Sequence, residues 1–160
     1  MKDVSAVMMA SYVIQFLVLM LGAYYFGISI FSFIPKKEKK LDKITDRDYA
    51  LVVAAHNEEK VIKNLIDSLN SQDYPKDKYQ IFVIADNCTD STAKIAAEAG
   101  ATVFERTDSE CKGKGFALEW MFDKIYKMER KFDSIAIFDA DNIVSPEFLK
   151  NINLQHNRGA

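Results

Sequence analysis

The stretch YALVVAAHNEE at residues 49–59 decides the fold. Its first seven residues form a continuous apolar run, which is typical of a β-strand buried on both faces of a sheet. The polar residues from His56 onward mark the end of this strand. Apolar residues then recur at helical spacing between positions 61 and 69, which predicts an amphipathic helix that ends before Pro75. A buried strand followed directly by such a helix indicates an α/β protein.

The same alternation of strand and helix continues along the chain. It argues for an α/β fold, a Rossmann-like, mostly parallel sheet with helices on both faces. Because ligands bind at the carboxyl ends of the strands in such sheets, the polar clusters at 56–59, 86–90 and 139–142 are expected to line one edge. The further predicted strands are 79–85, 101–104 and 134–138, and the further helices are about 90–99 with Asp90 as N-cap, 116–129, and one opening at Ser145.

The N-terminal segment has a different composition, because no charged residue occurs between Val4 and Ile34. As a helix it would be roughly 46 Å long, enough for one crossing of a bilayer core of roughly 30 Å. We predict a transmembrane anchor over residues 1–35. A cleaved signal peptide is an alternative, but its apolar core is usually only about 7–15 residues long. A buried core helix is another, but Gln15 is the only strongly polar side chain between Ser11 and Ser29.

A lysine-rich stretch follows, so residues 36–48 are predicted to be a basic linker. Positive flanks of membrane spans stay in the cytoplasm, which predicts a single-pass protein of the cell membrane with residues 49–160 on the cytoplasmic side. A merely solvated linker is the alternative. The formal net charge is -2, so nucleic acid is not an expected partner. Cys88 and Cys111 lack the spacing of a zinc or redox motif.

Asp139 and Asp141 are the sharpest chemical signal in the sequence. Two carboxylates one residue apart at the end of a strand can face the same hard cation. Mg²⁺ or Mn²⁺ is usually held by one or two carboxylates together with substrate phosphates, so this pair predicts a divalent-metal site for a nucleoside diphosphate. An Asx turn made by Asp141 or Asn142 ahead of the last helix is the alternative.

Three further residues are candidates for binding a ligand: Asp86 and Glu58, which come after predicted strands, and Lys114, which follows a glycine. A carboxylate at Asp86 can accept a hydrogen bond from a base N–H, although it could instead cap the next turn. Lys114 lies between two glycines and could reach a diphosphate, although an isolated lysine is most often solvated. Glu58 belongs to a sequence that also suits an ordinary helix start.

Together these segments resemble glycosyltransferase family 2. The segments 54–58, 83–92, 113–118 and 138–142 are similar to the motifs of that family in order and spacing, and the link at 69–75 is similar as well. The resemblance covers about residues 49–160. Its membrane-bound synthases of polysaccharides and glycolipids share the expected anchor and cytosolic domain. The family often has proline where this chain has Ala54.

The resemblance implies the N-terminal, donor-binding part of a GT-A glycosyltransferase domain, with the fold incomplete at its C-terminal end. It implies metal-dependent transfer of a sugar, with inversion, from a nucleotide sugar such as a UDP-sugar to a polysaccharide or lipid-linked acceptor. The family's general base lies in a later segment, so none is assigned in this chain. By matching motifs, the implied roles are Ala54, His56, Glu58 and Asp86 around the nucleoside, Lys114 and Asp139 at the diphosphate, and Asp139 with Asp141 at the metal.

Two other functions fit parts of the sequence. A membrane-tethered module could bind a nucleotide sugar without catalysing transfer. A phosphotransferase of the haloacid dehalogenase type is suggested by residues 139–143, which nearly match its nucleophile motif. That motif normally opens its domain, however, whereas here it follows three predicted strands.

Overall fold

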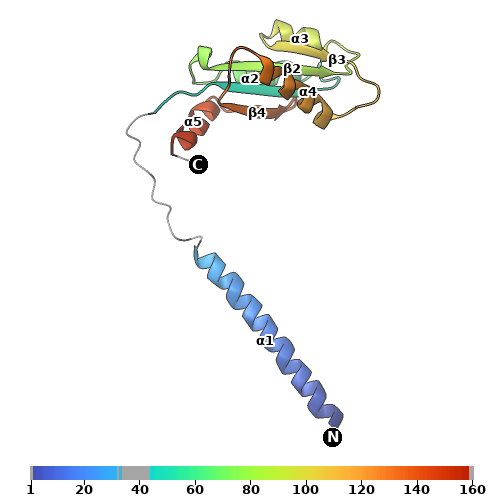
Figure 1. Ribbon diagram of the computed structural model, residues 1–160, viewed down its shortest axis with the longest axis vertical. Helices are drawn as coiled ribbons and strands as arrows, with labels where there is room; N and C mark the ends of the chain where they lie inside the picture. The colour runs from blue at the N-terminus through green and yellow to red at the C-terminus, as the bar shows by residue number, and fades with distance from the viewer. Residues whose placement is uncertain (1, 32, 34–43, 159–160) are drawn as a thin grey trace. The chain divides into compact units, whose positions relative to one another are not determined.

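The computed structural model describes residues 2–31, 33 and 44–158 (Figure 1). The chain divides into two compact units, residues 1–39 and 40–160. The first contains one helix and the second contains the α/β domain. The boundary predicted at Pro35 and most of the predicted basic linker lie outside the described residues.

Helix α1 (Lys2–Phe31) forms the N-terminal unit. Its segment Met8–Phe31 is long and apolar enough to cross a membrane by length and composition, with a mean hydropathy of 1.9. The described side chains of this segment are exposed on nearly every side, unlike those of a helix packed in a core. The amide of Gln15 donates a hydrogen bond to the Ser11 hydroxyl one turn earlier, at 3.2 Å, so this polar group has a partner within the helix.

The second unit is built on a four-stranded sheet in the order β3-β2-β1-β4. All three strand pairings are parallel, as predicted. The register places Ala55 beside Ala85, Ala54 beside Asp139, and Asp86 beside Arg106. The carboxyl ends of all four strands therefore meet at one edge. The strands are β1 (Tyr49–Ala55), β2 (Tyr79–Asp86), β3 (Thr102–Arg106) and β4 (Ser134–Asp139).

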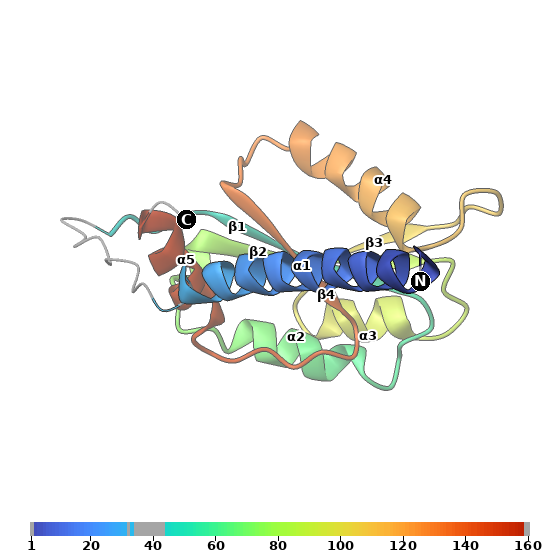
Figure 2. The ribbon, with the colours of Figure 1, turned by 90° about the horizontal axis from the view of Figure 1, so that it is seen from below.

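Helices cover both faces of the sheet, also as predicted (Figure 2). Successive residues of β1 point to opposite faces, so Leu51 and Val53 pack in one core and Ala50 and Val52 in the other. The first core is closed by α2, α3 and α5, and α4 is the helix that closes the second among the described residues. The helices are α2 (Ile62–Asn70), α3 (Thr92–Glu98), α4 (Lys114–Lys127) and α5 (Phe148–Arg158), with a short 3-10 helix η1 (Lys76–Lys78) before β2.

Three predicted helix starts were wrong by one or two residues. Helix α4 begins at Lys114, because Gly113 adopts a φ of 113° and turns the chain directly into the helix. Helix α5 begins at Phe148, whose N–H closes a turn onto the carbonyl of Ser145 at 3.0 Å. Helix α3 begins at Thr92, and the Asp90 carboxylate accepts the N–H of that residue at 3.0 Å.

Candidate functional site

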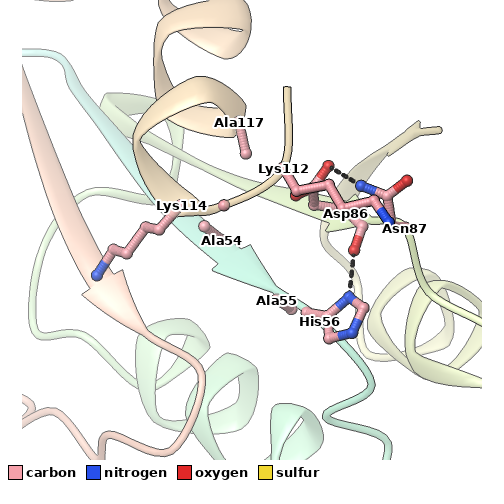
Figure 3. A pocket seen from close by; sticks show the side chains of 9 residues that line it. Ala54, Ala55, His56, Asp86, Asn87, Lys112, Lys114 and Ala117 are labelled. Atoms are coloured by element: carbon pink, nitrogen blue, oxygen red, sulfur yellow. Dashed lines mark hydrogen bonds between the residues drawn. The ribbon is translucent and has the colours of Figure 1, made fainter. Parts of the chain in front are cut away.

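A cavity of about 530 Å³ opens at the carboxyl edge of the sheet (Figure 3). It lies between the ends of β1 and β2 and the start of α4. Its volume falls within the usual range for small-molecule sites, about 300–1,000 Å³. Four of the predicted site residues line it: Ala54, His56, Asp86 and Lys114. The remaining lining residues are Ala55, Asn87, Lys112, Gly113 and Ala117.

His56 follows the last residue of β1, and its side chain contacts the end of β2. Its Nδ1 lies 2.7 Å from the backbone carbonyl oxygen of Asp86 (Figure 3). Because a carbonyl only accepts hydrogen bonds, Nδ1 must carry the proton in this contact. The imidazole is therefore held across the ends of the two central strands, where it lines the cavity.

Asp86 is the last residue of β2 and is only 7% exposed. Its Oδ1 accepts hydrogen bonds from Nη1 of Arg106 at 2.6 Å and from the side-chain amide of Asn87 at 3.0 Å. Within the described part of the chain, no group donates to its Oδ2. The hydrogen bond that Arg106 donates to the Asp86 carboxylate raises the pKa of Arg106. The negative charge that the sequence predicted at this position is therefore paired inside the protein.

Arg106 also organises the loop between β3 and α4. Its Nη2 donates to the Asp108 carboxylate at 2.9 Å and to the carbonyl of Cys111 at 2.7 Å. Asn87 reinforces this arrangement, because its side-chain oxygen accepts the N–H of Asp108 at 2.9 Å. The loop that leads to Lys114 is thus tied to the end of β2 by two side chains.

The loop after β1 is tied to the next loop in a similar way. The N–H of Glu58 donates to the hydroxyl of the buried Thr92 at 2.7 Å. Asn57, at a φ of 56°, accepts the N–H of Thr89 at 2.8 Å through its side-chain oxygen. Glu58 follows His56 closely in the chain, but it is not among the residues that line the cavity.

Lys114 and Asp139 form an ion pair. Lys114 is the first residue of α4, and Asp139 is the last residue of β4. Asp139 and Asp141 are both exposed and do not line the cavity. The turn after β4 is closed by the N–H of Asn142 on the carbonyl of Asp139, at 3.1 Å. A backbone hydrogen bond therefore closes this turn, and the Asx-turn alternative for Asp141 or Asn142 stays open.

The acidic pair fits a metal that is also bound by substrate. In residues 2–31, 33 and 44–158, no three or more His, Cys, Asp and Glu side chains are placed to hold a metal ion together. Two carboxylates are nevertheless the usual protein contribution to a Mg²⁺ shell that is completed by phosphates and water. Asp139 and Asp141 could therefore hold a cation jointly with a diphosphate.

Sequence reasoning missed three residues of this site: Arg106, Asn87 and Lys112. Lys112 lines the cavity, and it was overlooked because an exposed lysine in a polar loop resembles any solvated lysine. Asn87 carries a weak signal, because asparagine after a strand tolerates a positive φ, here 51°. Arg106 gives no signal until the register places it beside Asp86.

Residues 46–156 match the family described as glycosyltransferase like family 2. The chain is 33% identical over 108 residues to a beta-monoglucosyldiacylglycerol synthase of Nostoc sp., covering 64% of this chain and 22% of the relative. It is 30% identical over 130 residues to the probable glycosyltransferase YdaM of Bacillus subtilis, covering 78% of this chain and 29% of the relative. The chain therefore spans less than a third of the length of these relatives.

Solved structures show the same fold. A mannosyltransferase of Pyrobaculum calidifontis, in complex with GDP-Man and Mn²⁺, matches with a TM-score of 0.66 and 20% identity over 82% of this chain and 39% of its own. The glucosyl-3-phosphoglycerate synthase of Mycobacterium tuberculosis, in complex with Mn²⁺, UDP and phosphoglyceric acid, matches with a TM-score of 0.51 and 27% identity over 65% of this chain and 37% of its own. The sheet is thus GT-A-like. The family match over residues 46–156 supports the glycosyltransferase prediction over the haloacid dehalogenase alternative. The chain belongs to glycosyltransferase family 2.

Proposed function

We propose that residues 49–160 form the donor-binding part of a glycosyltransferase that uses a nucleoside diphosphate sugar. The observation that carries this proposal is the placement of Asp86 and Lys114 on opposite sides of one cavity (Figure 3). Asp86 offers an acceptor to a base N–H, and Lys114 offers a cation to the diphosphate. Because UDP and GDP both present such a ring N–H, the pocket suits these nucleotides, and we expect UDP.

A divalent cation, Mg²⁺ or Mn²⁺, completes the proposed site. Asp139 and Asp141 would hold it, and when bound it would neutralise charge on the departing diphosphate. Lys114 would add a second positive charge at the same place. The ion pair between Lys114 and Asp139 supports this assignment, because it shows that the lysine reaches the end of β4 where the metal would lie.

The proposed reaction is transfer of the sugar, with inversion, to a glycan or lipid acceptor. Two relatives support a lipid acceptor by their names: the beta-monoglucosyldiacylglycerol synthase and a 4,4'-diaponeurosporenoate glycosyltransferase of Staphylococcus aureus. In this chain the work of the named residues is to bind and orient the donor and to stabilise the leaving group. No described residue is assigned as the general base.

Replacing Lys114 with alanine tests the donor pocket. Calorimetric titration of the full chain in detergent, with Mn²⁺ present, should show UDP affinity lowered about tenfold or more, as expected for loss of a hydrogen bond to a charged group. Affinity for uridine, which lacks the diphosphate, should hardly change. Lys127→Ala is the matched control, because Lys127 is exposed at the other end of α4. Equal UDP affinities for both variants and the wild type would refute the assignment.

We also propose that α1 anchors the protein in the cell membrane in a single pass, with the α/β domain in the cytoplasm. The apolar span and the lysine-rich segment after it support this topology. Cys111 is exposed and can report it. In a Cys88→Ser variant expressed in bacteria, a membrane-impermeant maleimide should label Cys111 in inside-out vesicles but not in intact cells. Labelling in intact cells would contradict the topology.

A further inference from the structure

We propose that Arg106 is a positioning residue for the donor pocket. Its side chain holds Asp86 and the loop of residues 107–113 in one fixed arrangement. The inference rests on the proposed function and extends it. Arg106 does not line the cavity, so it acts through the groups that it binds. One side of the guanidinium holds the residue proposed to meet the base, and the other holds the loop that leads to Lys114.

Burial makes the pairing of Arg106 and Asp86 mutually dependent. The two residues are 6% and 7% exposed, and they lie side by side in the register of β2 and β3. A charge buried at this depth is costly without a partner. Removing the guanidinium would therefore leave the Asp86 carboxylate without its cation, and its orientation would no longer be set.

The contact also determines which oxygen of Asp86 faces a ligand. Arg106 and Asn87 both donate to Oδ1, and Oδ2 has no donor within the described part of the chain. A carboxylate in this arrangement presents an acceptor. Uracil and guanine carry a ring N–H that can donate to it, whereas cytosine and adenine present a ring nitrogen that is itself an acceptor. Arg106 would thus set the preference for UDP or GDP over CDP and ADP.

The second contact set fixes the loop. Nη2 of Arg106 binds the carboxylate of Asp108 and the carbonyl of Cys111, three residues before Lys114. Asp108 in turn accepts the N–H groups of Glu110 and Cys111, both at 2.9 Å. Without the guanidinium, this loop keeps its internal hydrogen bonds and the hydrogen bond from the Asp108 N–H to Asn87, but it loses both hydrogen bonds from Arg106.

Four variants of the full chain separate these two roles. Arg106→Gln removes both contacts. Arg106→Lys supplies one ammonium for Asp86 but no second nitrogen for the loop. Asp108→Ala removes the loop carboxylate that Arg106 and the N–H groups of Glu110 and Cys111 bind, and it leaves the pair of Arg106 and Asp86 in place. The control is Arg130→Gln, because Arg130 pairs with Asp48 at 2.8 Å in the same way but next to the amino end of β1.

The first measurement is calorimetric titration with UDP, GDP, CDP and ADP in the presence of Mn²⁺. The wild type and Arg130→Gln should bind UDP more tightly than CDP, or GDP more tightly than ADP, depending on whether UDP or GDP is the nucleotide that the pocket binds better. This ratio of affinities is the preference that the variants are compared by. In Arg106→Gln this preference should fall by about tenfold or more, since an oriented partner for the ring N–H is lost. Arg106→Lys should restore the preference. An unchanged preference in Arg106→Gln overturns the inference.

The second measurement, hydrogen–deuterium exchange without nucleotide, does not depend on donor binding. Exchange in residues 107–113 should be faster in Arg106→Gln, Arg106→Lys and Asp108→Ala than in the wild type and Arg130→Gln. Unchanged exchange in the Arg106 variants overturns the positioning role. Absence of nucleotide binding by the wild type would instead contradict the proposed function, so the two failures are distinguishable.

Discussion

Replacing Thr92 with valine removes the hydroxyl that joins the loop after β1 to the start of α3. Thr92 is fully buried, and its Oγ1 accepts the N–H of Glu58 at 2.7 Å. The same hydroxyl donates to the Asp90 carboxylate at 2.6 Å. Valine keeps the shape of the side chain, so the substitution deletes two hydrogen bonds and leaves no cavity.

The expected loss can be worked out from the two bonds. Asp90 is part-exposed, and water can replace the lost donor at its carboxylate. The N–H of Glu58 lies in a part-buried contact and loses its only acceptor among the described residues. An unsatisfied N–H of this kind costs about 1–3 kcal/mol. We therefore expect the free energy of unfolding to fall by about 1–3 kcal/mol, with the larger effect if water cannot reach the N–H.

Urea unfolding of the full chain in detergent, followed by the fluorescence of Trp120, measures this change. Trp120 is the only tryptophan, and it packs against Phe104 in the core on the α4 side of the sheet. Thr102→Val is the matched control: the Thr102 hydroxyl makes an exposed contact with Gln80, so its loss should cost no more than about 0.5 kcal/mol. If Thr92→Val were as stable as this control, the assigned role of the hydroxyl would be wrong.

Two further predictions concern other parts of the domain. Gly113→Ala should lower the free energy of unfolding by about 1–3 kcal/mol, because a φ of 113° is strained for any side chain. Gly115→Ala is the control and should be neutral or stabilising, because Gly115 lies in the first turn of α4 with open space around it. Thermal melts of the two variants and the wild type measure the difference. Burial alone would raise the pKa of Asp48, but hydrogen bonds from Lys78 and Arg130 outweigh it and lower that pKa. The resulting stability is present above the unfolded-state pKa of about 3.9 and is lost as the pH falls from there through the lower folded-state pKa. The free energy of unfolding, measured with urea, should therefore fall less between pH 7 and pH 3 in Asp48→Asn than in the wild type.

The sheet and its functional edge could be predicted from the sequence because they depend on local patterns. A run such as 49–55 can only be buried on both faces, and parallel strands must bring their carboxyl ends to one edge. This is why His56 and Asp86 were expected at the same edge, and with Ala54 they line one cavity. Lys114 lines it too, but it begins α4, and its place followed from the family resemblance. Glu58 and Asp139 do not line the cavity. For Glu58 the reason is that the direction of a loop depends on hydrogen bonds such as the one to Thr92.

The role of Arg106 could not be predicted in this way. An arginine at the end of a short strand resembles a solvated residue, and its partner Asp86 lies 20 residues away. Only the register between β2 and β3 brings the two together. The start of α4 was missed for a different reason: the two glycines around Lys114 suggested a loop, whereas Gly113 alone makes the turn and Gly115 lies inside the helix.

The central claim is that the acidic pair at the end of β4 and the cavity beside it form one metal-dependent donor site. Calorimetric titration of UDP into the full chain, with and without Mn²⁺, tests it most directly. Binding should require Mn²⁺ in the wild type and in the control Asp123→Ala, which removes an exposed carboxylate on α4. The Mn²⁺-dependent binding should be lost in Asp141→Ala. Unchanged UDP affinity in Asp141→Ala would contradict the account.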